Sequence, residues 1–378
     1  MPENLDPEQN ALRLAAETLI TDLMPLERAL EAGEPVESVR PRVIQASREA
    51  GFFGMTQPKA VGGSEAGALP LTVVREALAS ANLEVGRFVF GPRPGVLIAA
   101  DGRLREEYLL PHLKGEKRGT FGFTESDSAP RPTWARQEGD ELVVNGLKSF
   151  VTQARGADFV SALVNVEKDA AGVGGTAMVV IDLDAPGVTF EREFSTLEGG
   201  DHAAIRFTDV RVPKWRVVGK LGEGMPRALQ NISTVRMSLS AEACGMMSYA
   251  LDYVTDYISA PHRSGVPLSD REGVRLRYAD MRIDAYAARS MLYRTARLVD
   301  SEANDVNEVM CCKIFCTEAA GRVIDQAVQL VGGNALTRGH PLERLYRHVR
   351  SMRFTEGASD ILRLNVARGK LELGLGTL

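Results

Sequence analysis

The sequence lacks the features that mark membrane, nucleic-acid-binding and secreted proteins. No apolar run approaches the roughly 20 residues of a membrane-spanning helix. The formal net charge of −5 provides no overall basic field for nucleic acid. The N-terminus, Met1 to Asp6, is acidic and polar, unlike a secretory signal. With 378 residues, 44% hydrophobic and 25% charged, the composition indicates a cytoplasmic globular enzyme of about two or three domains.

Residue patterns that bind metals or dinucleotides are also missing. Three of the four cysteines cluster as Cys311, Cys312 and Cys316, without a matching cysteine or histidine group elsewhere. The five histidines do not have metal-ligand spacing. No Gly-x-Gly-x-x-Gly follows a strand-like run, and no Ser-His-Asp set is suggested. We therefore expect buried free thiols, no metal and no Rossmann dinucleotide site.

Hydrophobic periodicity divides the chain into three segments. Apolar residues at helical spacing fill residues 1–115, and strand-like runs separated by turn residues fill residues 116–222. Long helical patterns return in residues 223–378. We expect an α+β fold with an N-terminal helical domain, a central antiparallel β domain and a C-terminal helical bundle over these ranges. Within them, Asn145-Gly146 predicts a hairpin turn, and the acidic stretch 300–305 predicts a solvated loop between helices.

A loop near the C-terminus carries a candidate general base. Residues 353–360 precede a helical pattern, for which Ser359 or Asp360 is the expected N-cap. Glu356 lies just outside this helix start, and Gly357 lets the backbone pass close to a ligand. A carboxylate held there can take a proton near neutral pH. An isolated Glu-Gly pair is more often part of a solvated loop, so the rest of the chain must decide.

Three further segments, in chain order, carry a family resemblance. They are Phe121–Asp127, Lys148–Ala154, and Gln329–Asn334 continuing through Pro341–Arg347 to Glu356-Gly357. Supporting segments are Phe207–Pro213, Leu221–Gly224, Arg236 within a long helix, and Tyr257–Arg263. In this order, over nearly the whole chain, the sequence resembles the acyl-CoA dehydrogenase family.

The resemblance implies a bound FAD between the β domain and the C-terminal helices. Thr124 and Thr152 are expected to donate hydrogen bonds to the flavin ring, and Phe150 to pack against it where many relatives have Trp. The full set of residues expected at the cofactor is Phe123, Thr124, Phe150, Thr152, Arg263, Gln329, Gly332, Gly333, Ala358 and Asp360. Of these, Arg263, Gln329, Gly332 and Gly333 match positions that reach the cofactor of a neighbouring subunit.

The resemblance also implies the reaction. Glu356 falls on the position of the catalytic base for α,β-desaturation of an acyl-CoA to its 2-enoyl-CoA, with Arg236 and Gly357 at the substrate. Some branches of the family place the base just before the equivalent of Arg236, but Val235 cannot take a proton. An electron-transfer flavoprotein is the expected electron acceptor, and a homodimer or homotetramer the expected assembly.

Departures from the family pattern keep other hypotheses open. Thr355 and Ala358 flank the base where an aromatic residue and Thr are common, so the substrate is not copied from fatty-acyl relatives. A flavoenzyme with altered chemistry, such as a monooxygenase, reductase or eliminating enzyme, is one alternative. Arg93 could meet an anionic acyl tail, although a surface position is the simpler interpretation. A flavin-bearing nucleic-acid binder is another alternative, suggested by Arg338, Arg344, Arg347, Arg350 and Arg353.

Overall fold

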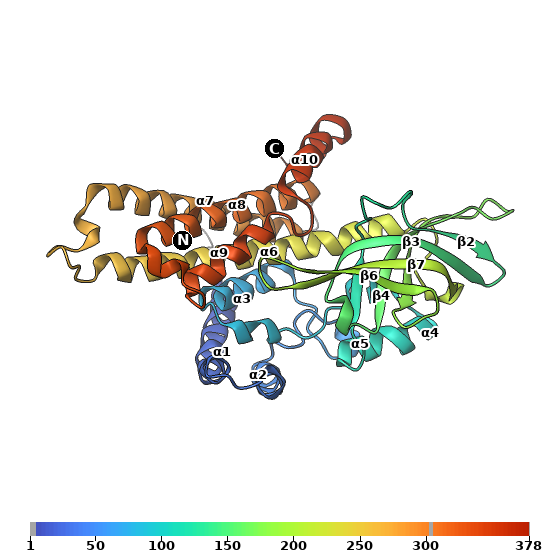
Figure 1. The fold of residues 1–378 in the computed structure, drawn as a ribbon, viewed down its shortest axis with the longest axis horizontal. Coiled ribbons are helices and arrows are strands. Elements are labelled where there is room, and N and C mark those ends of the chain that lie inside the picture. The colour runs from blue at the N-terminus through green and yellow to red at the C-terminus, as the bar shows by residue number, and fades with distance from the viewer. Residues whose placement is uncertain (1–4, 302–304, 378) are drawn as a thin grey trace. The chain divides into compact units, whose positions relative to one another are not determined.

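The computed structural model describes residues 5–301 and 305–377, which form two compact units (Figure 1). Unit 1 takes the described residues of Met1–Met55, Glu65–Phe90 and Ser233–Leu378, and unit 2 takes Thr56–Ser64 and Gly91–Ile232. The element order is helices, then strands, then helices, as the sequence predicts. The exact domain boundaries at residues 115 and 222 stay predictions.

Unit 1 is helical. Its helices are α1 (Pro7–Glu31), α2 (Val36–Glu49), α3 (Ala68–Ser80), α6 from residue 233 (whole helix Gly224–Ser259), α7 (Glu272–Asp300), α8 (Val306–Val331), α9 (Pro341–Met352) and α10 (Ser359–Leu373). The long helices α6, α7 and α8 run beside one another (Figure 1) and share one apolar core. Helix α8 places Cys312, Val323 and Ala327 fully inside that core, because apolar residues recur every three or four positions along it.

Unit 2 is built on one curved sheet. Its strands are β1 (Gly119–Gly122), β2 (Trp134–Glu138), β3 (Glu141–Thr152), β4 (Phe159–Val166), β5 (Gly175–Asp182), β6 (Val188–Ser195), β7 (Asp201–Pro213) and β8 (Val217–Val218). The strand order is β6-β7-β3-β2-β4-β5-β8, with β1 added beside β4. Most pairs are antiparallel, but β1 and β2 each pair with β4 in parallel.

Both faces of the sheet are covered with apolar side chains. On β4, Phe159 and Leu163 face one side and pack with the short helices α4 (Gly102–Leu104) and α5 (Leu110–Lys114). Val160 and Val164 point to the opposite face and join a second cluster with β3, β5 and β7. Because successive side chains of a strand alternate, a near-continuous apolar run such as β4 indicates burial on both faces.

The predicted hairpin at Asn145-Gly146 is wrong. Strand β3 continues through both residues, with a register shift against β7 between Val144 and Gly146. The turn lies earlier, where Glu138 pairs with Glu141 across β2 and β3. A Cβ on Gly146 would lie 2.5 Å from the hydroxyl of Thr133. The glycine therefore allows a close approach to Thr133, opposite a bulge of β7 at Thr208 and Asp209, rather than a turn.

A second bulge lies further along β3. Lys148 pairs with Ile205 of β7 and Val151 pairs with Ala203, so Ser149 and Phe150 together face one residue of β7. Phe150 has a φ of 54°, in the left-handed region that bulky residues seldom adopt. This bulge turns the Phe150 side chain out of the sheet, and 60% of the residue is exposed.

Asp300 is exposed, as predicted for the stretch 300–305, but it belongs to a helix rather than to a loop. Asp300 is the last residue of α7, and its carboxylate accepts hydrogen bonds from the backbone N–H groups of Ala68 (2.6 Å) and Leu69 (2.8 Å). These are first-turn donors of α3, whose own N-cap, Gly67, has no side chain to supply. Residues 302–304 lie outside the described part of the chain.

The predicted free thiols are confirmed, although Cys311 is only half-buried. All four cysteines are free thiols, and Cys244, Cys312 and Cys316 are buried. Among the described residues, no group of histidine, cysteine, aspartate and glutamate side chains is placed to hold a metal ion. In residues 5–301 and 305–377, no helix has both the length and the apolar character needed to cross a membrane.

Replacing Asp300 with Ala removes the cap of α3 and should lower the free energy of unfolding by about 1 kcal/mol. Hydrogen exchange of the Ala68 and Leu69 amides should accelerate, because both lose their acceptor. Asp280→Ala, an exposed site on the same helix, is the matched control and should change stability by less than about 0.5 kcal/mol. Equal effects of both substitutions in urea denaturation would contradict the capping role.

Candidate functional site

One edge of unit 2 gathers four residues predicted at the flavin. The backbone carbonyl of Thr124 accepts a hydrogen bond from Ser149 N–H (3.0 Å), which places Phe123 and Thr124 beside the end of β3. Phe150 and Thr152 follow on β3 itself. Both threonines are exposed, while Phe123 is half-buried. The segments that carry these four residues therefore meet at the end of β3, and their contact with a flavin stays a prediction.

A buried lysine holds the segment of Phe123 and Thr124 against β3. Lys148 on β3 is fully buried, and its ammonium donates to the carbonyl of Phe123 (3.2 Å) and pairs with the Glu125 carboxylate. The hydroxyl of Thr133 donates to the other oxygen of Glu125 (2.8 Å). Burial lowers the pKa of Lys148, and the hydrogen bond and charge of Glu125 partly offset this. The segment before Thr124 is thus held by a charge-assisted contact.

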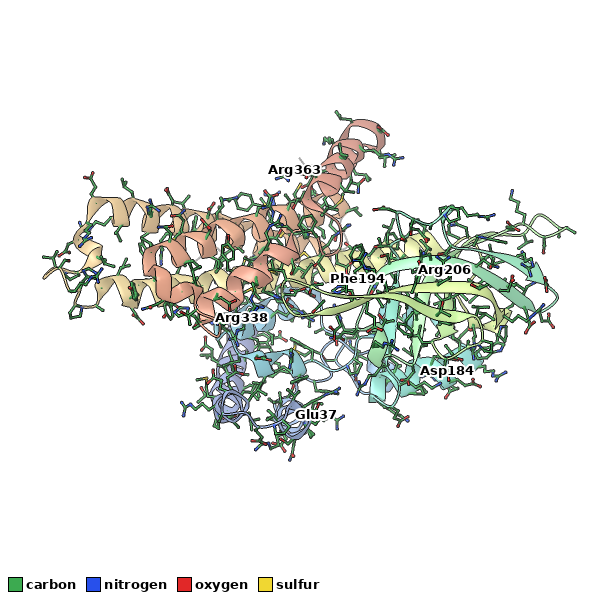
Figure 2. All side chains as sticks on the ribbon, in the orientation of Figure 1. Glu37, Asp184, Phe194, Arg206, Arg338 and Arg363 are labelled. Atoms are coloured by element: carbon green, nitrogen blue, oxygen red, sulfur yellow. The ribbon has the colours of Figure 1, made fainter. Side chains whose placement is uncertain are left out.

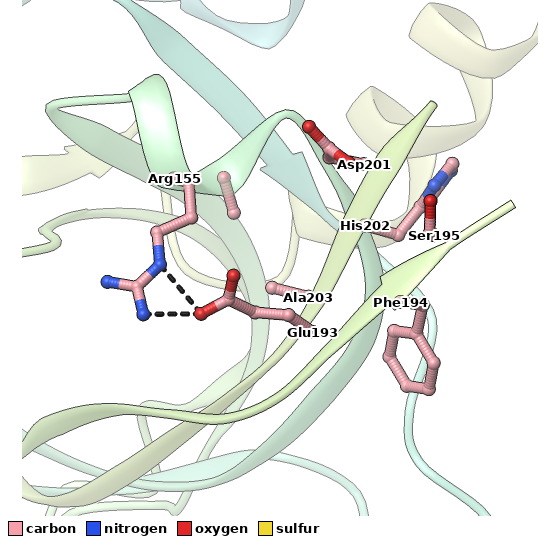
Figure 3. Close-up of a pocket in the computed structure, with 8 residues that line it drawn as sticks. Arg155, Glu193, Phe194, Ser195, Asp201, His202 and Ala203 are labelled. Carbon is pink, nitrogen blue, oxygen red and sulfur yellow. Dashed lines mark hydrogen bonds and ion pairs between the residues drawn. The ribbon is translucent and has the colours of Figure 1, made fainter. Parts of the chain in front are cut away.

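A surface pocket of about 330 Å³ lies next to the same edge, and Figure 3 shows its lining. It is lined by Ala154, Arg155, Glu193, Phe194, Ser195, Asp201, His202 and Ala203. Phe194 stacks on Phe150, with ring centroids 5.0 Å apart and planes 21° apart. The Arg155 guanidinium donates to Glu193 Oε1 from its Nε at 2.7 Å (Figure 3). The pocket therefore adjoins the predicted residues through one aromatic pair.

This edge suits a flat ring system with a polar rim. Phe150 and Phe194 offer stacked apolar surface, and the exposed hydroxyls of Thr124 and Thr152 can donate hydrogen bonds. Sequence reasoning missed Phe194, although Val188, Phe190 and Phe194 are the apolar residues of a strand-like run. An isoalloxazine ring is a flat ring system of this kind.

In unit 1, Glu356 lies at the tip of a closed loop. The N–H of Ser359 donates to the carbonyl of Arg353 (3.0 Å), which closes the segment between α9 and α10. Glu356 has a φ of 57° and Gly357 a φ of 109°, so both lie in the left-handed region. This conformation is unfavourable for a residue with a side chain and persists only where surrounding contacts enforce it. Glu356 itself is half-buried.

Two buried cations make such contacts. Arg236 of α6 donates from Nε to the carbonyl of Glu356 (3.0 Å). Lys313 of α8 donates from Nζ to the carbonyls of Gly357 (2.8 Å) and Arg353 (3.3 Å). Burial lowers the pKa of Arg236, whereas the charge of Glu356 raises it. The structure therefore brings the predicted substrate residue Arg236 to the loop of the predicted base.

The helix start after this loop differs from the prediction. The N-cap of α10 is Ala358, which has no side-chain hydrogen bond to offer, and Ser359 is the first helical residue. Ser359 instead turns its hydroxyl toward the carbonyl of Arg353 (3.4 Å), and Asp360 is exposed beside Arg363 (3.5 Å). Figure 2 shows Arg363 on α10. Ser359 does not cap α10 because both its N–H and its hydroxyl close the loop at the Arg353 carbonyl.

The remaining predicted cofactor residues lie at the other end of α8. Gln329, Gly332 and Gly333 form its C-terminal end, and Arg263 follows the end of α6. The Tyr257 hydroxyl donates to the carbonyl of Val331 (3.1 Å), which ties these two ends together. At a rise of about 1.5 Å per residue, Gln329 lies roughly 24 Å along α8 from Lys313. Within unit 1 these residues form a group separate from Glu356.

The arginine stretch from Arg338 to Arg353 is largely engaged inside unit 1. Arg344 donates to the carbonyl of Asn82 (2.9 Å), Arg347 pairs with Glu343 (2.7 Å) and Arg353 with Glu318 (3.7 Å). The guanidinium of Arg350 stacks over the Phe354 ring at 4.8 Å. Arg338 is exposed (Figure 2). These pairings favour internal ion pairing over a basic stripe for nucleic acid.

Arg93 is exposed, in keeping with a surface position.

Comparison with known proteins places these features in a family. The model of the acyl-CoA dehydrogenase N-terminal domain matches residues 6–116, and that of the C-terminal domain matches residues 222–371. "Probable acyl-CoA dehydrogenase YngJ" of Bacillus subtilis is 30% identical over 335 residues, covering 86% of this chain and 88% of its own length.

A second relative carries a different reaction in its name. The caffeyl-CoA reductase-Etf complex subunit CarC of Acetobacterium woodii is 27% identical over 365 residues, covering 93% of this chain and 94% of its own. The crystal structure of a probable acyl CoA dehydrogenase from Mycobacterium abscessus has a TM-score of 0.81 and 29% identity, covering 96% of this chain and 98% of that one. On the family models and the B. subtilis relative, this chain belongs to the acyl-CoA dehydrogenase family of oxidoreductases.

Proposed function

We propose that this protein oxidises an acyl-CoA thioester to its 2-enoyl-CoA, with Glu356 as the base. The observation that carries the proposal is the Glu356 loop. A carboxylate-bearing residue is held in a left-handed conformation, half-buried, by contacts from Arg236 and Lys313 to backbone carbonyls. Such enforcement of an unfavourable backbone conformation is typical of functional sites. Membership of the family supports the same role for this position.

Separate groups of this chain remove the proton, polarise the thioester carbonyl and hold the base in place. Glu356 removes the proton from the α-carbon, and its own backbone N–H polarises the thioester carbonyl, which makes that proton more acidic. Arg236 keeps the Glu356 carbonyl in place (3.0 Å), and Gly357 leaves room beside the base for the substrate. FAD, the cofactor of this family, supplies the acceptor for the hydride that leaves the β-carbon.

The residues that would hold FAD form two sets. Phe123, Thr124, Phe150 and Thr152 on the edge of unit 2 suit the ring, and Ala358 and Asp360 flank the base loop. Arg263, Gln329, Gly332 and Gly333 form the second set, at the far end of α8 from Lys313. Their distance from Glu356 in the same unit supports contact with the cofactor of a neighbouring copy. We therefore propose a homodimer or homotetramer.

A reductase is the second candidate, because the relative from A. woodii is named as a caffeyl-CoA reductase subunit in a complex with Etf. The same base and cofactor run the reaction backwards when Glu356 delivers a proton to an enoyl-CoA. In either direction we propose an electron-transfer flavoprotein as the redox partner and the cytoplasm as the location.

A substrate panel separates the two directions. Oxidised enzyme should lose its flavin absorbance anaerobically with at least one acyl-CoA, and the product should be the 2-enoyl-CoA. If only the dithionite-reduced enzyme reacts, and only with enoyl-CoAs, the reductase is the better assignment. Rapid oxygen consumption during turnover would instead indicate a monooxygenase.

Glu356→Gln should slow flavin reduction by about 100-fold or more, because an amide cannot take the α-proton. Bound FAD should remain stoichiometric, as measured by its absorbance. Glu37→Gln, an exposed site on α2 (Figure 2), is the control and should leave the rate unchanged. Full activity of the Glu356 variant with its FAD retained would exclude it as the base.

Thr124→Val tests the edge of unit 2. Loss of one hydrogen bond to the ring should weaken FAD binding by about 2- to 13-fold, because such a bond contributes roughly 0.5–1.5 kcal/mol. The measurement is the dissociation constant of FAD from the apoprotein. Thr208→Val, an exposed threonine on β7, is the control. Equal FAD affinity of the Thr124 variant and the wild type would remove Thr124 from the cofactor site.

A further inference from the structure

Lys313 is a buried cation that the assigned chemistry does not use. It lies on α8 between Cys312 and Ile314, and the residue is fully buried. Sequence reasoning overlooked it, although its position follows the apolar face of the helix. A lysine is seldom buried fully, because removing an ammonium from water is unfavourable unless strong partners replace the water.

The partners of Lys313 are loop carbonyls rather than a carboxylate. Its Nζ donates to Gly357 O at 2.8 Å and to Arg353 O at 3.3 Å. These carbonyls lie one residue after Glu356 and three residues before it. The ammonium therefore bridges both arms of the loop that presents the base, and Arg236 holds the carbonyl at the tip.

The charges around Lys313 come from three elements. Arg236 of α6 and Arg353 of the loop oppose its positive charge, while Glu356 of the loop and Glu318 of α8 favour it. Burial is the largest effect and lowers the pKa of Lys313 to about 8, with the charge of Arg236 adding to it. A methionine would fill the same space without this desolvation, so core packing alone does not explain a lysine here.

We propose that Lys313 is a positioning residue for Glu356: its ammonium fixes the backbone on both sides of the base and supplies a positive charge that favours the carboxylate form. This inference rests on the proposed role of Glu356. The left-handed backbone at Glu356 needs enforcement, and Lys313 provides two of the hydrogen bonds that enforce it.

The test compares Lys313→Met with the wild-type holoenzyme. Anaerobic flavin reduction by a saturating acyl-CoA should slow about 100-fold, the effect of roughly a 1 Å misplacement of a catalytic group. KM should change little, because Lys313 does not touch the substrate. The acidic limb of the pH–rate profile should move to higher pH, because a positive charge near the carboxylate is lost. A merely structural lysine would not move this limb.

The wild-type enzyme carries an internal check. Lys313 becomes neutral as the pH rises past about 8, so the rate difference from Lys313→Met should narrow above that pH. The stability of the wild type relative to Lys313→Met should instead increase with pH. Between about pH 8 and pH 10.5 the unfolded chain binds more protons at this lysine than the folded chain. The urea midpoint of the wild type, relative to Lys313→Met, should therefore increase with pH over that window.

Two further variants keep the test decisive. Thr317→Val removes a fully buried hydroxyl one turn along α8 that bonds only within the helix, and it should leave rate and pH profile unchanged. Lys313→Gln keeps a donor without the charge, so it should shift the acidic limb as Lys313→Met does while slowing the reaction less. Lys313→Gln takes over the test if the methionine variant does not fold.

The proposal is overturned if the Lys313 variants, with FAD bound, react within about three-fold of the wild type, or if they slow without any shift of the acidic limb. Its failure is distinct from failure of the proposed function. An inactive Glu356→Gln beside fully active Lys313 variants removes only the positioning role. A fully active Glu356→Gln removes the base, whatever the Lys313 variants do.

Discussion

A buried ammonium bound to backbone carbonyls is the interaction on which both candidate loops depend. In unit 2, Lys148 donates to Phe123 O beside Thr124, and in unit 1, Lys313 donates to Gly357 O beside Glu356. Both lysines are fully buried. A loop has no ladder of its own to satisfy its carbonyls, so a donor must reach it from a rigid element. Lysine suits this because its long apolar stem crosses the core while its head supplies three donors.

The two loops differ in how the cation is balanced. Lys148 pairs directly with Glu125, which gives it a formal counter-ion. Lys313 depends on carbonyl oxygens, with Glu356 and Glu318 acting on it through their charges. The positive charge of a cation that is not paired directly with a carboxylate can stabilise the ionised form of a nearby base. The loop of unit 1 is therefore organised electrostatically as well as sterically.

Much of the fold could be predicted from periodicity, since β1 to β8 lie within the predicted strand segment 116–222 and α6 to α10 within the predicted helical segment 223–378. Motif order led to the family and to Glu356 and Arg236 as neighbours. What failed depends on tertiary contact. Asn145-Gly146 has turn chemistry, but both residues continue β3, where Gly146 lies close to Thr133 and β7 forms a bulge opposite them. The capping role of Asp300 could not be predicted because its partners lie more than two hundred residues earlier. Lys313 was missed because lysine side chains are usually exposed to solvent.

The second register shift of β3, at Ser149 and Phe150, determines where an aromatic ring is exposed, independently of which aromatic residue stands there. Phe150 leaves the sheet because the chain carries one residue more than its partner strand there, with a φ of 54°. The backbone of the bulge therefore sets the direction of the side chain. A larger aromatic residue at this position would be displayed from the same place. Substitution at position 150 can consequently change the size of the exposed aromatic surface without moving the backbone of β3.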